Sequence, residues 1–447
     1  MRYPEALAYL DSFANYEKQP PSHYGRRTYS LRRMVELMDA LERPQERYPT
    51  IHIAGSKGKG SSAAMMDSIL RCAGRKVGLY SSPHLMRFGE RVKVDGTELG
   101  WDELVRLVEE LAPFLETFRG KGVTYFEAVT AMALLHFARK KVDVAVLEVG
   151  LGGRLDATNV VRPACSCITT LDLEHTDRLG NTLLEIAGEK AGVIKRGVPC
   201  VTTCLDSACR GLFEERTRDR RARVRLLEKD FFLEAVEDGR PLGRSSIAVR
   251  GESWEYSDLE IGLLGWHQRI NAAGVVAMVE QLKKQGERIE EGAVRGGLQS
   301  VVCEGRLQKM EGMPLVVMDC AHSRISAQCL RQSMEEMFEE WRPKIGLVGF
   351  LKDKDYPAFL EALSPVMDGW VVTEPDSPRA RGGEEVLEFL TQRYGKKAQV
   401  RSAGDALCAA KKDAGPGGMV LVTGSMYLVG EMLRQAGKRE VEEAESA

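Results

Sequence analysis

The stretch Ile51-His-Ile-Ala-Gly-Ser-Lys-Gly-Lys-Gly-Ser61 decides the fold of the first half of the chain. It predicts a strand with apolar Ile51 and Ile53, a turn with three glycines, and an amphipathic helix that ends near Gly74. Glycines let backbone N–H groups curve around an anion, and a helix N-terminus adds partial positive charge. A lysine such as Lys59 can reach terminal phosphates. The stretch therefore predicts a phosphate-binding loop, and a nucleoside triphosphate is the favoured ligand.

This loop departs from the usual Walker pattern in two ways. Two residues, rather than four, separate Gly55 from Gly58, and Gly60 stands where a Ser or Thr normally contacts Mg²⁺. A loop hydroxyl such as Ser82, which follows the next expected strand, would supply that contact. The alternative interpretation is an ordinary glycine-rich turn in an α/β domain, and the rest of the sequence makes that alternative much weaker.

Length and composition exclude several classes of protein. A chain of 447 residues is expected to form two or three domains, and its 43% hydrophobic and 29% charged residues are ordinary for a soluble globular protein. The net charge of -2 gives no reason to expect nucleic acid or an anionic membrane as a partner. No apolar run approaches membrane-spanning length, and Met1–Glu5 do not begin a signal peptide, so we expect a cytoplasmic protein.

The ten cysteines contain no CxxC pair. Reduced, mostly buried thiols are therefore expected, and a zinc site is not, since no His or Cys cluster has ligand spacing.

Short apolar runs alternate with helical stretches along the chain, which predicts parallel sheets built from βαβ units. The hairpin-like run Ser246–Tyr256 predicts a small antiparallel subsheet in the first domain. The regular pattern breaks near Gly292–Gly305, and we place the domain boundary there, giving domains 1–300 and 301–447. The expected strands are Thr50–Ala54, Val77–Ser81, Val142–Val149, Ser166–Thr170, Leu315–Asp319, Lys344–Gly349, Gly369–Thr373 and Met419–Thr423.

Polar residues follow two expected strands of the first domain. Glu148 ends an apolar strand, where an acidic residue can hold Mg²⁺ near the phosphates; capping the strand is the alternative. A glycine-rich polar loop, 149–159, comes next. His175 follows another strand, on the edge where open α/β sheets bind ligands. Lys190 lies at the end of a helical stretch, and its simplest interpretation is a surface residue.

The second half of the chain repeats this arrangement. Asp319 and His322 come just beyond a strand end, where Asp319 could bind a ribose hydroxyl. A further set of polar residues would be hard to explain as core: His267, Gln268, Asn271 and Arg306.

Taken together, these segments resemble the folylpolyglutamate synthases and dihydrofolate synthases of the Mur ligase superfamily. They cover most of the chain in the family's order, and the run at 147–160 is the most specific. The segments are HIAGSKGKGS (52–61), YSSPHLMRFGERV (80–92), TYFEAVTAMA (124–133), LEVGLGGRLDATNV (147–160), EHTDRLGNTLLEIAGEKAGVIK (174–195), LLGWHQRINAA (263–273), GRL (305–307), FLKDKD (350–355), PRA (378–380) and TGSMYLVGE (423–431).

The resemblance implies an α/β protein with an N-terminal P-loop ATPase domain that carries the small antiparallel subsheet, and a smaller C-terminal Rossmann-like α/β domain with a glutamate-ligase role. It implies a ligase of folate and one-carbon metabolism that uses ATP and two Mg²⁺ ions. The enzyme would add L-glutamate to folates, as in tetrahydrofolate polyglutamylation, and to dihydropteroate, through an acyl phosphate. We expect a monomer whose partners are small molecules: folate or dihydropteroate, L-glutamate and ATP.

The resemblance also assigns roles to individual residues. Lys190 matches a lysine that is carbamylated in the superfamily, and a carbamate is an anionic oxygen ligand where an ammonium would repel a metal. His322 is a candidate base for the attacking amine. The implied catalytic residues are Lys59, Lys190 and His322. The implied nucleotide-binding residues are Gly55, Ser56, Lys57, Gly58, Lys59, Gly60, Ser61, Asn271, Arg306 and Asp319. The implied metal-binding residues are Ser82, Glu148 and His175. The implied substrate-binding residues are Arg87, Phe126, Asp156, Ala157 and Ser425.

Two departures from the family pattern stand out. Where the family often has Thr-Asn, this chain has Ser56-Lys57, and Lys57 would either add a cation beside the phosphates or point to solvent. After Asp319 the family commonly reads Gly-Ala-His-Asn-Pro, whereas this chain reads Cys320-Ala-His-Ser-Arg324.

The segment Arg154–Thr158 looks like that of bifunctional bacterial enzymes and favours both synthase activities in one chain. The alternatives are a folylpolyglutamate synthase alone, another Mur-type ligase that acts on a cell-wall precursor, a kinase, and a non-catalytic nucleotide-binding homologue.

Overall fold

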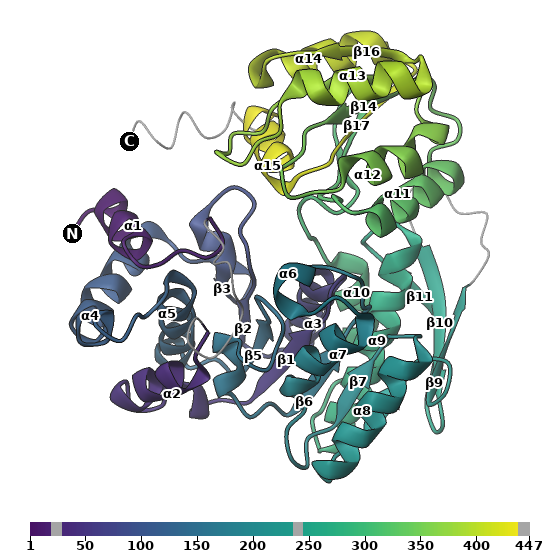
Figure 1. The fold of residues 1–447 in the computed structure, drawn as a ribbon. Helices are drawn as coiled ribbons and strands as arrows, with labels where there is room; N and C mark the ends of the chain where they lie inside the picture. Colours follow the sequence, from purple (N-terminus) through teal and green to yellow (C-terminus); the bar gives the residue numbers. More distant parts are fainter. Residues whose placement is uncertain (19–28, 236–244, 437–447) are drawn as a thin grey trace. The chain divides into compact units, whose positions relative to one another are not determined.

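The computed structural model describes residues 1–18, 29–235 and 245–436, which form two compact units (Figure 1). The first unit takes the described residues up to 235, with 246–261 and 269–301. The second takes 302–436 and also 262–268, which the predicted division assigned to the first domain. The expected folding domains, 1–300 and 301–447, remain a prediction. None of the helices in the described ranges has the length and apolar character needed to cross a membrane.

The first unit is built on an eight-stranded sheet with the order β4-β3-β2-β5-β1-β6-β7-β8. The strands from β2 to β8 in that order run parallel, and β3 and β4 add an antiparallel edge. Every residue of the central strand β1 is buried, as expected for a parallel strand covered on both faces. The bounds are β1 Thr50–Ala54, β2 Val77–Tyr80, β3 Val92–Val94, β4 Thr97–Glu98, β5 Val144–Glu148, β6 Cys165–Ile168, β7 Cys200–Thr202 and β8 Val224–Leu226.

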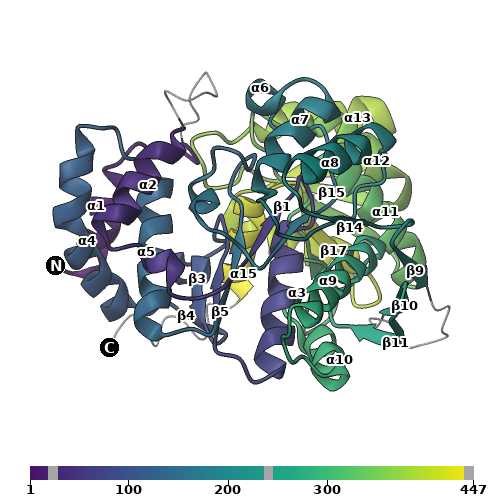
Figure 2. The ribbon, with the colours of Figure 1, turned by 90° about the horizontal axis from the view of Figure 1, so that it is seen from below.

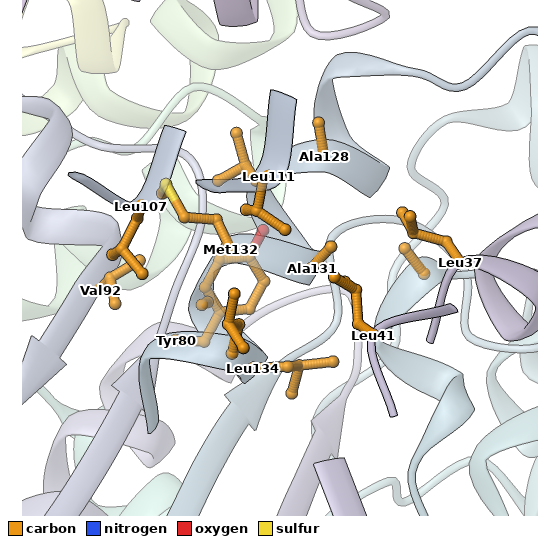
Figure 3. Packing of buried hydrophobic residues seen from close by; sticks show 14 of the residues in the cluster. Leu37, Leu41, Tyr80, Val92, Leu107, Leu111, Ala128, Ala131, Met132 and Leu134 are labelled. Atoms are coloured by element: carbon orange, nitrogen blue, oxygen red, sulfur yellow. The ribbon is translucent and has the colours of Figure 1, made fainter. Parts of the chain in front are cut away.

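Helices cover this sheet. On the side of β2, helices α1, α2, α4 and α5 enclose a large apolar core (Figures 1 and 2). Figure 3 shows how side chains of α4 and α5 meet Tyr80 of β2 and Leu37 of α2. Burial of this apolar surface is the main stabilising contribution to the unit. The bounds are α1 Tyr3–Asp11, α2 Leu31–Ala40, α3 Lys59–Cys72, α4 Trp101–Arg119, α5 Tyr125–Lys140, α6 Thr176–Leu179, α7 Leu183–Lys190, α8 Ser207–Asp219, α9 Trp266–Lys284 and α10 Glu291–Ser300.

The helix after the phosphate loop, α3, ends as the sequence predicts. Gly74 has a φ of +76°, its N–H donates to Arg71 O at 2.9 Å, and the Arg75 N–H donates to Leu70 O at 3.0 Å. These two bonds form a Schellman motif, which needs a left-handed residue at the position of Gly74.

The α3 helix packs very closely against α10, and this contact yields a stability prediction. A Cβ on Gly297 of α10 would lie 2.4 Å from Ile69 Cα and 2.6 Å from Ile69 N of α3. Because backbone atoms cannot move aside as a side chain can, Gly297→Ala is expected to lower the free energy of unfolding by about 2 kcal/mol. Urea unfolding followed by circular dichroism measures this change.

The control for this prediction lies on the same helix. A Cβ on the exposed Gly292 would meet nothing within 4 Å. Gly292→Ala is therefore expected to raise the free energy of unfolding by about 0.5 kcal/mol, through the lower entropy of the unfolded chain. Equal effects of the two substitutions would contradict the close helix contact.

The predicted hairpin is confirmed as part of a three-stranded sheet with the order β11-β10-β9. Gly251 N–H donates to Trp254 O at 2.9 Å across the turn, and β9 pairs antiparallel with β10. The third strand, β9, was not predicted. The bounds are β9 Phe231–Ala235, β10 Ser245–Gly251 and β11 Glu255–Ile261.

The second unit holds a six-stranded sheet with the order β12-β13-β17-β14-β15-β16, parallel except at the β12 edge. Its core contains the fully buried Phe359 and Trp370. The strands are β12 Gln308–Met310, β13 Leu315–Met318, β14 Lys344–Val348, β15 Gly369–Val372, β16 Lys397–Val400 and β17 Met419–Thr423. The helices are α11 Arg324–Met337, α12 Tyr356–Leu363, α13 Gly383–Tyr394, α14 Ala403–Ala414 and α15 Met426–Ala436.

The expected fold class is confirmed, because both units are α/β and the first carries the small antiparallel sheet. The eight predicted strands all form, with bounds that agree within two residues. All ten cysteines are free thiols, and six of them are buried, as expected: Cys165, Cys167, Cys200, Cys204, Cys209 and Cys320.

Candidate nucleotide and metal site

The phosphate loop, residues 55–60, joins β1 to α3 in the predicted way. Gly58 has a φ of +86° and is the N-cap of α3, so Lys59 is the first residue of that helix. A Cβ on Gly58 would lie 2.2 Å from Asn271 Oδ1, so a side chain there would displace the buried Asn271 of α9. The structure thus brings Asn271, which lies more than 200 residues away in the sequence, against the loop.

Hydrogen bonds fasten the first half of the loop to the segment that follows β6. Ser56 N–H and Lys57 N–H both donate to Thr170 O, at 3.0 and 3.1 Å, and the Ser56 hydroxyl donates to Asp172 O at 3.1 Å. Thr169 Oγ1 in turn donates to Lys57 O at 2.7 Å. These bonds leave the loop little freedom, which suits a preformed anion site.

A small pocket opens beside the loop, at the carboxyl ends of β1 and β5. Lys59 Nζ donates to Gly55 O at 3.0 Å, and Lys190 Nζ donates to the same oxygen at 2.8 Å. Two amines therefore meet at the loop carbonyl, where phosphate groups would gain from positive charge. The lining residues are Gly55, Lys59, Val149, Gly150, Leu151, Gly152, Glu174, His175 and Lys190.

Lys190 is not a surface residue, so the simplest interpretation of its sequence position was wrong. It ends α7 and is only 4% exposed. Burial lowers its pKa to about 7, and the nearby Lys59 charge adds to this effect. Near neutral pH a large share of Lys190 is therefore an uncharged amine, the form that reacts with electrophiles.

A set of contacts holds the α7 end against the glycine-rich loop after β5. Arg154 N–H donates to Glu189 O at 2.8 Å, and the Arg154 guanidinium contacts the Glu189 carboxylate at 2.7 Å. The Asn159 amide donates to Gly192 O at 3.2 Å. These contacts fix the backbone on both sides of Lys190, and sequence patterns carry no signal that pairs Arg154 with Glu189.

Glu148 and the Ser82 backbone come together beside the phosphate loop, whereas the predicted metal contact of the Ser82 hydroxyl stays a prediction. Glu148 ends β5 and is 6% exposed, and Ser82 N–H donates to Glu148 Oε2 at 3.3 Å. A Cβ on Gly60 would lie 3.4 Å from the same Oε2. Position 60 therefore lies at ordinary contact distance from the Glu148 carboxylate, beside the phosphate loop.

His175 lines the same pocket and is the N-cap of the short α6, with a φ of +54°. Within residues 1–18, 29–235 and 245–436, no group of three or more His, Cys, Asp or Glu side chains could hold a metal alone. The Glu148 carboxylate beside the phosphate loop fits Mg²⁺, which keeps waters and binds through one or two carboxylates plus substrate phosphates; Ser82 and His175 remain predicted ligands.

Lys57 does not point to solvent, so that interpretation of its side chain was wrong. Its Nζ lies 2.8 Å from Glu174 Oε1 and 4.0 Å from Asp172 Oδ2, and its side chain is 23% exposed. The extra cation of the loop is therefore paired with acidic residues that follow β6.

In the second unit, Asp319 organises the backbone around it. Its buried carboxylate accepts from Leu307 N–H at 2.9 Å and from Ala321 N–H at 2.8 Å. The nearby His267 has a pKa lowered by burial, which Asp319 opposes and Arg306 reinforces. Asp319, Arg306 and His267 thus interact electrostatically within this unit.

The contacts of His322 and Ser323 explain part of the unusual sequence Cys320–Arg324. His322 Nδ1 lies 2.9 Å from Cys320 O, and a carbonyl can only accept, so Nδ1 carries the proton. In the neutral ring Nε2 then holds the basic lone pair. Ser323, where the family commonly has Asn, is the N-cap of α11 and accepts from Ser326 N–H at 3.4 Å. Ser and Asn are both good caps, so this departure keeps the local function.

Comparison with known proteins decides the family. Residues 53–279 match the Mur ligase middle domain, and residues 305–426 match the Mur ligase glutamate ligase domain. A dihydrofolate synthase/folylpolyglutamate synthase of Mycobacterium tuberculosis is 36% identical over 390 residues, which cover 84% of this chain and 80% of that protein. The Bacillus subtilis protein of the same name is 33% identical and covers 91% of this chain and 94% of its own length.

Solved structures agree with these relatives. Mycobacterium tuberculosis folylpolyglutamate synthase, complexed with ADP and AMPPCP, has a TM-score of 0.87 and 32% identity over 97% of this chain and 98% of that one. Escherichia coli FolC, in complex with DHPP and ADP, has a TM-score of 0.85 and 30% identity over 98% of each chain. The chain belongs to the folylpolyglutamate synthase and dihydrofolate synthase family of Mur ligases.

Membership in this family makes the chain an ATP-dependent ligase that binds small-molecule substrates, as the sequence resemblance implied.

The residues implied for substrate binding differ in exposure and in their contacts. Arg87 is half exposed and contacts Glu98 at 3.2 Å, and Phe126 lies against Gly150 and packs near Tyr80.

The Asp156 carboxylate bonds to its own loop. It is buried and accepts from Leu151 N–H at 2.9 Å and from Thr158 N–H at 3.0 Å. The Thr158 hydroxyl also donates to Asp156 and therefore accepts from His52 Nε2, which lies 2.7 Å away. The side chain of Asp156 shapes the loop, and this relay from β1 was not predicted.

The remaining candidates are small or buried. Ala157 begins a short 3₁₀ helix after Asp156, and Ser61 is buried in the first turn of α3. Ser425 is 3% exposed and its hydroxyl accepts from Tyr427 N–H at 3.1 Å, at the start of α15. The ligand contacts of all these residues stay predictions.

Proposed function

We propose that this protein uses ATP and Mg²⁺ to join L-glutamate to the carboxylate of folates and of dihydropteroate, through an acyl phosphate. The observation that carries the proposal is the pocket where Lys59 and Lys190 meet on Gly55 O, beside Glu148 and the Ser82 backbone. Relatives in two bacteria carry both synthase names on one chain, and the related Escherichia coli protein was solved with DHPP and ADP.

The chemistry follows from the poor reactivity of a carboxylate. Transfer of the γ-phosphoryl group from ATP converts the acceptor carboxylate into an acyl phosphate, and the glutamate amine then displaces phosphate. Lys59 would bind the β- and γ-phosphates and stabilise the charge that spreads over the transferring group. Ser82, Glu148 and His175 would hold Mg²⁺, which when bound neutralises phosphate charge. His322 would accept the proton of the attacking amine at Nε2.

Lys190 supports a second part of the proposal, its carbamylation. The uncharged amine attacks the carbon of CO₂, a C–N bond forms, and one N–H proton leaves to solvent. The product carries an anionic oxygen pair in a pocket that already holds Lys59. Such a carbamate would turn Lys190 from a cation that repels Mg²⁺ into a ligand that binds it.

This carbamate has a predictable pH dependence. Because the pKa of Lys190 is about 7, its ammonium form dominates below that pH and cannot add CO₂, whereas the amine dominates above it. In protein equilibrated with ¹³C-labelled bicarbonate, the carbamate signal in the ¹³C NMR spectrum is expected to rise as pH increases through about 7. Lys190→Ala protein is the control and should lack this signal. A signal of equal size in that variant would remove the assignment to Lys190.

The experiment that tests the function is a paired assay. Purified protein with ATP, Mg²⁺ and L-glutamate receives either tetrahydrofolate or dihydropteroate, and phosphate release and product mass are measured. Glutamylated product from both acceptors is expected. Product from tetrahydrofolate alone would reduce the proposal to a folylpolyglutamate synthase, the name carried by a 32% identical relative in Lacticaseibacillus casei.

The same assay separates a folate ligase from three further candidate functions. A kinase would release ADP without needing glutamate, and a non-catalytic homologue would release no phosphate. A ligase for cell-wall precursors would use a UDP-sugar peptide and neither folate acceptor. Phosphate release that depends on both the acceptor and glutamate is expected, and its absence would contradict the proposed function.

A further inference from the structure

The phosphate loop contains two lysines with different surroundings. Lys59 Nζ bonds to the loop carbonyls Gly55 O and Ser56 O, at 3.0 and 3.4 Å. Lys57 Nζ instead lies 2.8 Å from Glu174, in an ion pair whose two side chains are 23% and 16% exposed. A half-buried pair at this distance is a charge-assisted hydrogen bond and is stronger than a surface ion pair. The amine of Lys57 is therefore committed to a carboxylate outside the loop.

Its partner, Glu174, links the loop to the predicted metal residue. Glu174 lines the pocket and directly precedes His175, whose φ of +54° is uncommon for a residue other than glycine. Such a conformation persists only where surrounding contacts hold it. His175 O accepts from two α6 N–H groups, of Arg178 and Leu179, so the turn 172–175 is bonded to α6 at its C-terminal end. The ion pair of Lys57 with Glu174 bonds the same turn to the phosphate loop.

The backbone bonds described above support the same connection. The Ser56 hydroxyl holds Asp172 O at 3.1 Å, and Asp172 Oδ2 lies 4.0 Å from Lys57 Nζ. Residues 172–175 are thus fastened to the loop at both a backbone and a side-chain position. The Lys57 ammonium thus spends at least one of its three donors on the Glu174 carboxylate.

We propose that Lys57 is a positioning residue, which through its ion pair with Glu174 fixes the turn 172–175 to the phosphate loop and so sets where the His175 imidazole meets bound metal. The inference rests on the metal role of His175 in the proposed function. If Lys57 positions His175, replacing Lys57 should weaken metal binding. If Lys57 instead contacted phosphate, its replacement should weaken nucleotide binding even in the absence of metal.

Binding measurements on full-length variants test this assignment. Lys57→Met removes the charge and keeps most of the length. Calorimetry measures ADP binding without metal, and electron paramagnetic resonance measures Mn²⁺ binding to the protein–ADP complex. Lys57→Met is expected to weaken Mn²⁺ binding by about tenfold and to change metal-free ADP binding by less than about twofold. Lys57→Arg should keep most of the Mn²⁺ affinity.

A charge swap and a surface control sharpen the test. The double variant Lys57→Glu, Glu174→Lys restores an ion pair with opposite direction and is expected to recover Mn²⁺ affinity that each single variant loses. Lys229 forms an exposed ion pair with Glu214 in the same unit. Lys229→Met removes a similar charge pair far from the loop in sequence and should match the wild-type protein in both measurements.

Hydrogen exchange gives a readout that does not need metal. Amides of residues 172–179 are expected to exchange faster in Lys57→Met, with no change in Lys229→Met. Two results would overturn the positioning role. One is unchanged exchange of residues 172–179 in Lys57→Met, and the other is a loss of metal-free ADP affinity as large as the loss of Mn²⁺ affinity. Mn²⁺ binding to His175→Ala tests the proposed function separately. If this variant binds Mn²⁺ as the wild type does, the metal role of His175 is wrong, whatever the exchange of Lys57→Met shows.

Discussion

Replacing Lys59 with alanine is expected to lower the rate of glutamate-dependent phosphate release by about 10³-fold or more. The reason is that Lys59 begins α3, and its Nζ lies against the loop carbonyls Gly55 O and Ser56 O on the pocket wall. A cation there would stabilise charge on the transferring phosphoryl group, and alanine at this position cannot. The turnover number with saturating tetrahydrofolate and ATP is the quantity to measure.

The loss must be separated from unfolding. Lys59 is only half buried, and alanine is a good helix former, so thermal unfolding of Lys59→Ala should match the wild type. The exposed Lys121, which pairs with Glu36 on the surface of the same unit, provides a matched control, and Lys121→Ala should keep full activity. Substantial ligase activity in folded Lys59→Ala would contradict the assignment of the phosphate loop.

Replacing Lys190 with alanine is expected to lower turnover by about 10²- to 10³-fold, and short carboxylic acids are expected to restore part of it. The truncation opens space in the pocket beside Lys59, and a small carboxylate that enters it can supply the anionic oxygens lost with the carbamate. Gly55 O keeps a donor from Lys59 after the change, so the loop should remain in place. Turnover with and without added formate or acetate measures the rescue.

Lys195 provides the control for this rescue. It is a half-buried lysine of the same unit, partial burial lowers its pKa to about 8, and its Nζ donates to Asn159 O at 2.8 Å. Lys195→Ala should lose stability through that hydrogen bond, but carboxylic acids should not raise its activity. Activity of Lys190→Ala that carboxylic acids leave unchanged would remove the support for a carbamate.

Much of the fold could be predicted because its buried strands are apolar and its turns contain diagnostic glycines. The central strand β1 and strand β17 have the predicted bounds, and Gly74 ends α3 as expected. Strands β7 and β8 were missed because they have only three residues each, and β8 also lies in a charge-rich stretch. Their place in the sheet depends on the pairing of β7 with β6 and of β8 with β7, which local pattern does not encode.

The candidate site could be predicted where function forces a residue type at a strand end. Glu148 ends a strand and His175 follows one, as the sequence predicts, whereas the metal contact of the Ser82 hydroxyl stays a prediction. Side-chain pairs between distant segments could not be predicted, because they depend on rotamers and on packing. The ion pair of Lys57 with Glu174 is one such contact, and the one of Arg154 with Glu189 is another.

The burial of Lys190 was missed for a related reason. A lysine at the end of a short helix is normally exposed, but here the Lys190 amine reaches Gly55 O of the phosphate loop, and the loop after β5 bonds to the end of α7. The loop bonds of the Asp156 carboxylate were not predicted either, and its assignment to substrate stays a prediction.

The central claim is that this pocket uses ATP to activate a carboxylate. It is tested most directly by labelling the acceptor carboxylate of tetrahydrofolyl glutamate with ¹⁸O and following the label during turnover with ATP, Mg²⁺ and L-glutamate. An acyl phosphate passes one carboxylate oxygen to phosphate when the amine displaces it, so mass spectrometry of the released phosphate should show a single ¹⁸O atom. Glutamylated product accompanied by unlabelled phosphate would contradict the account.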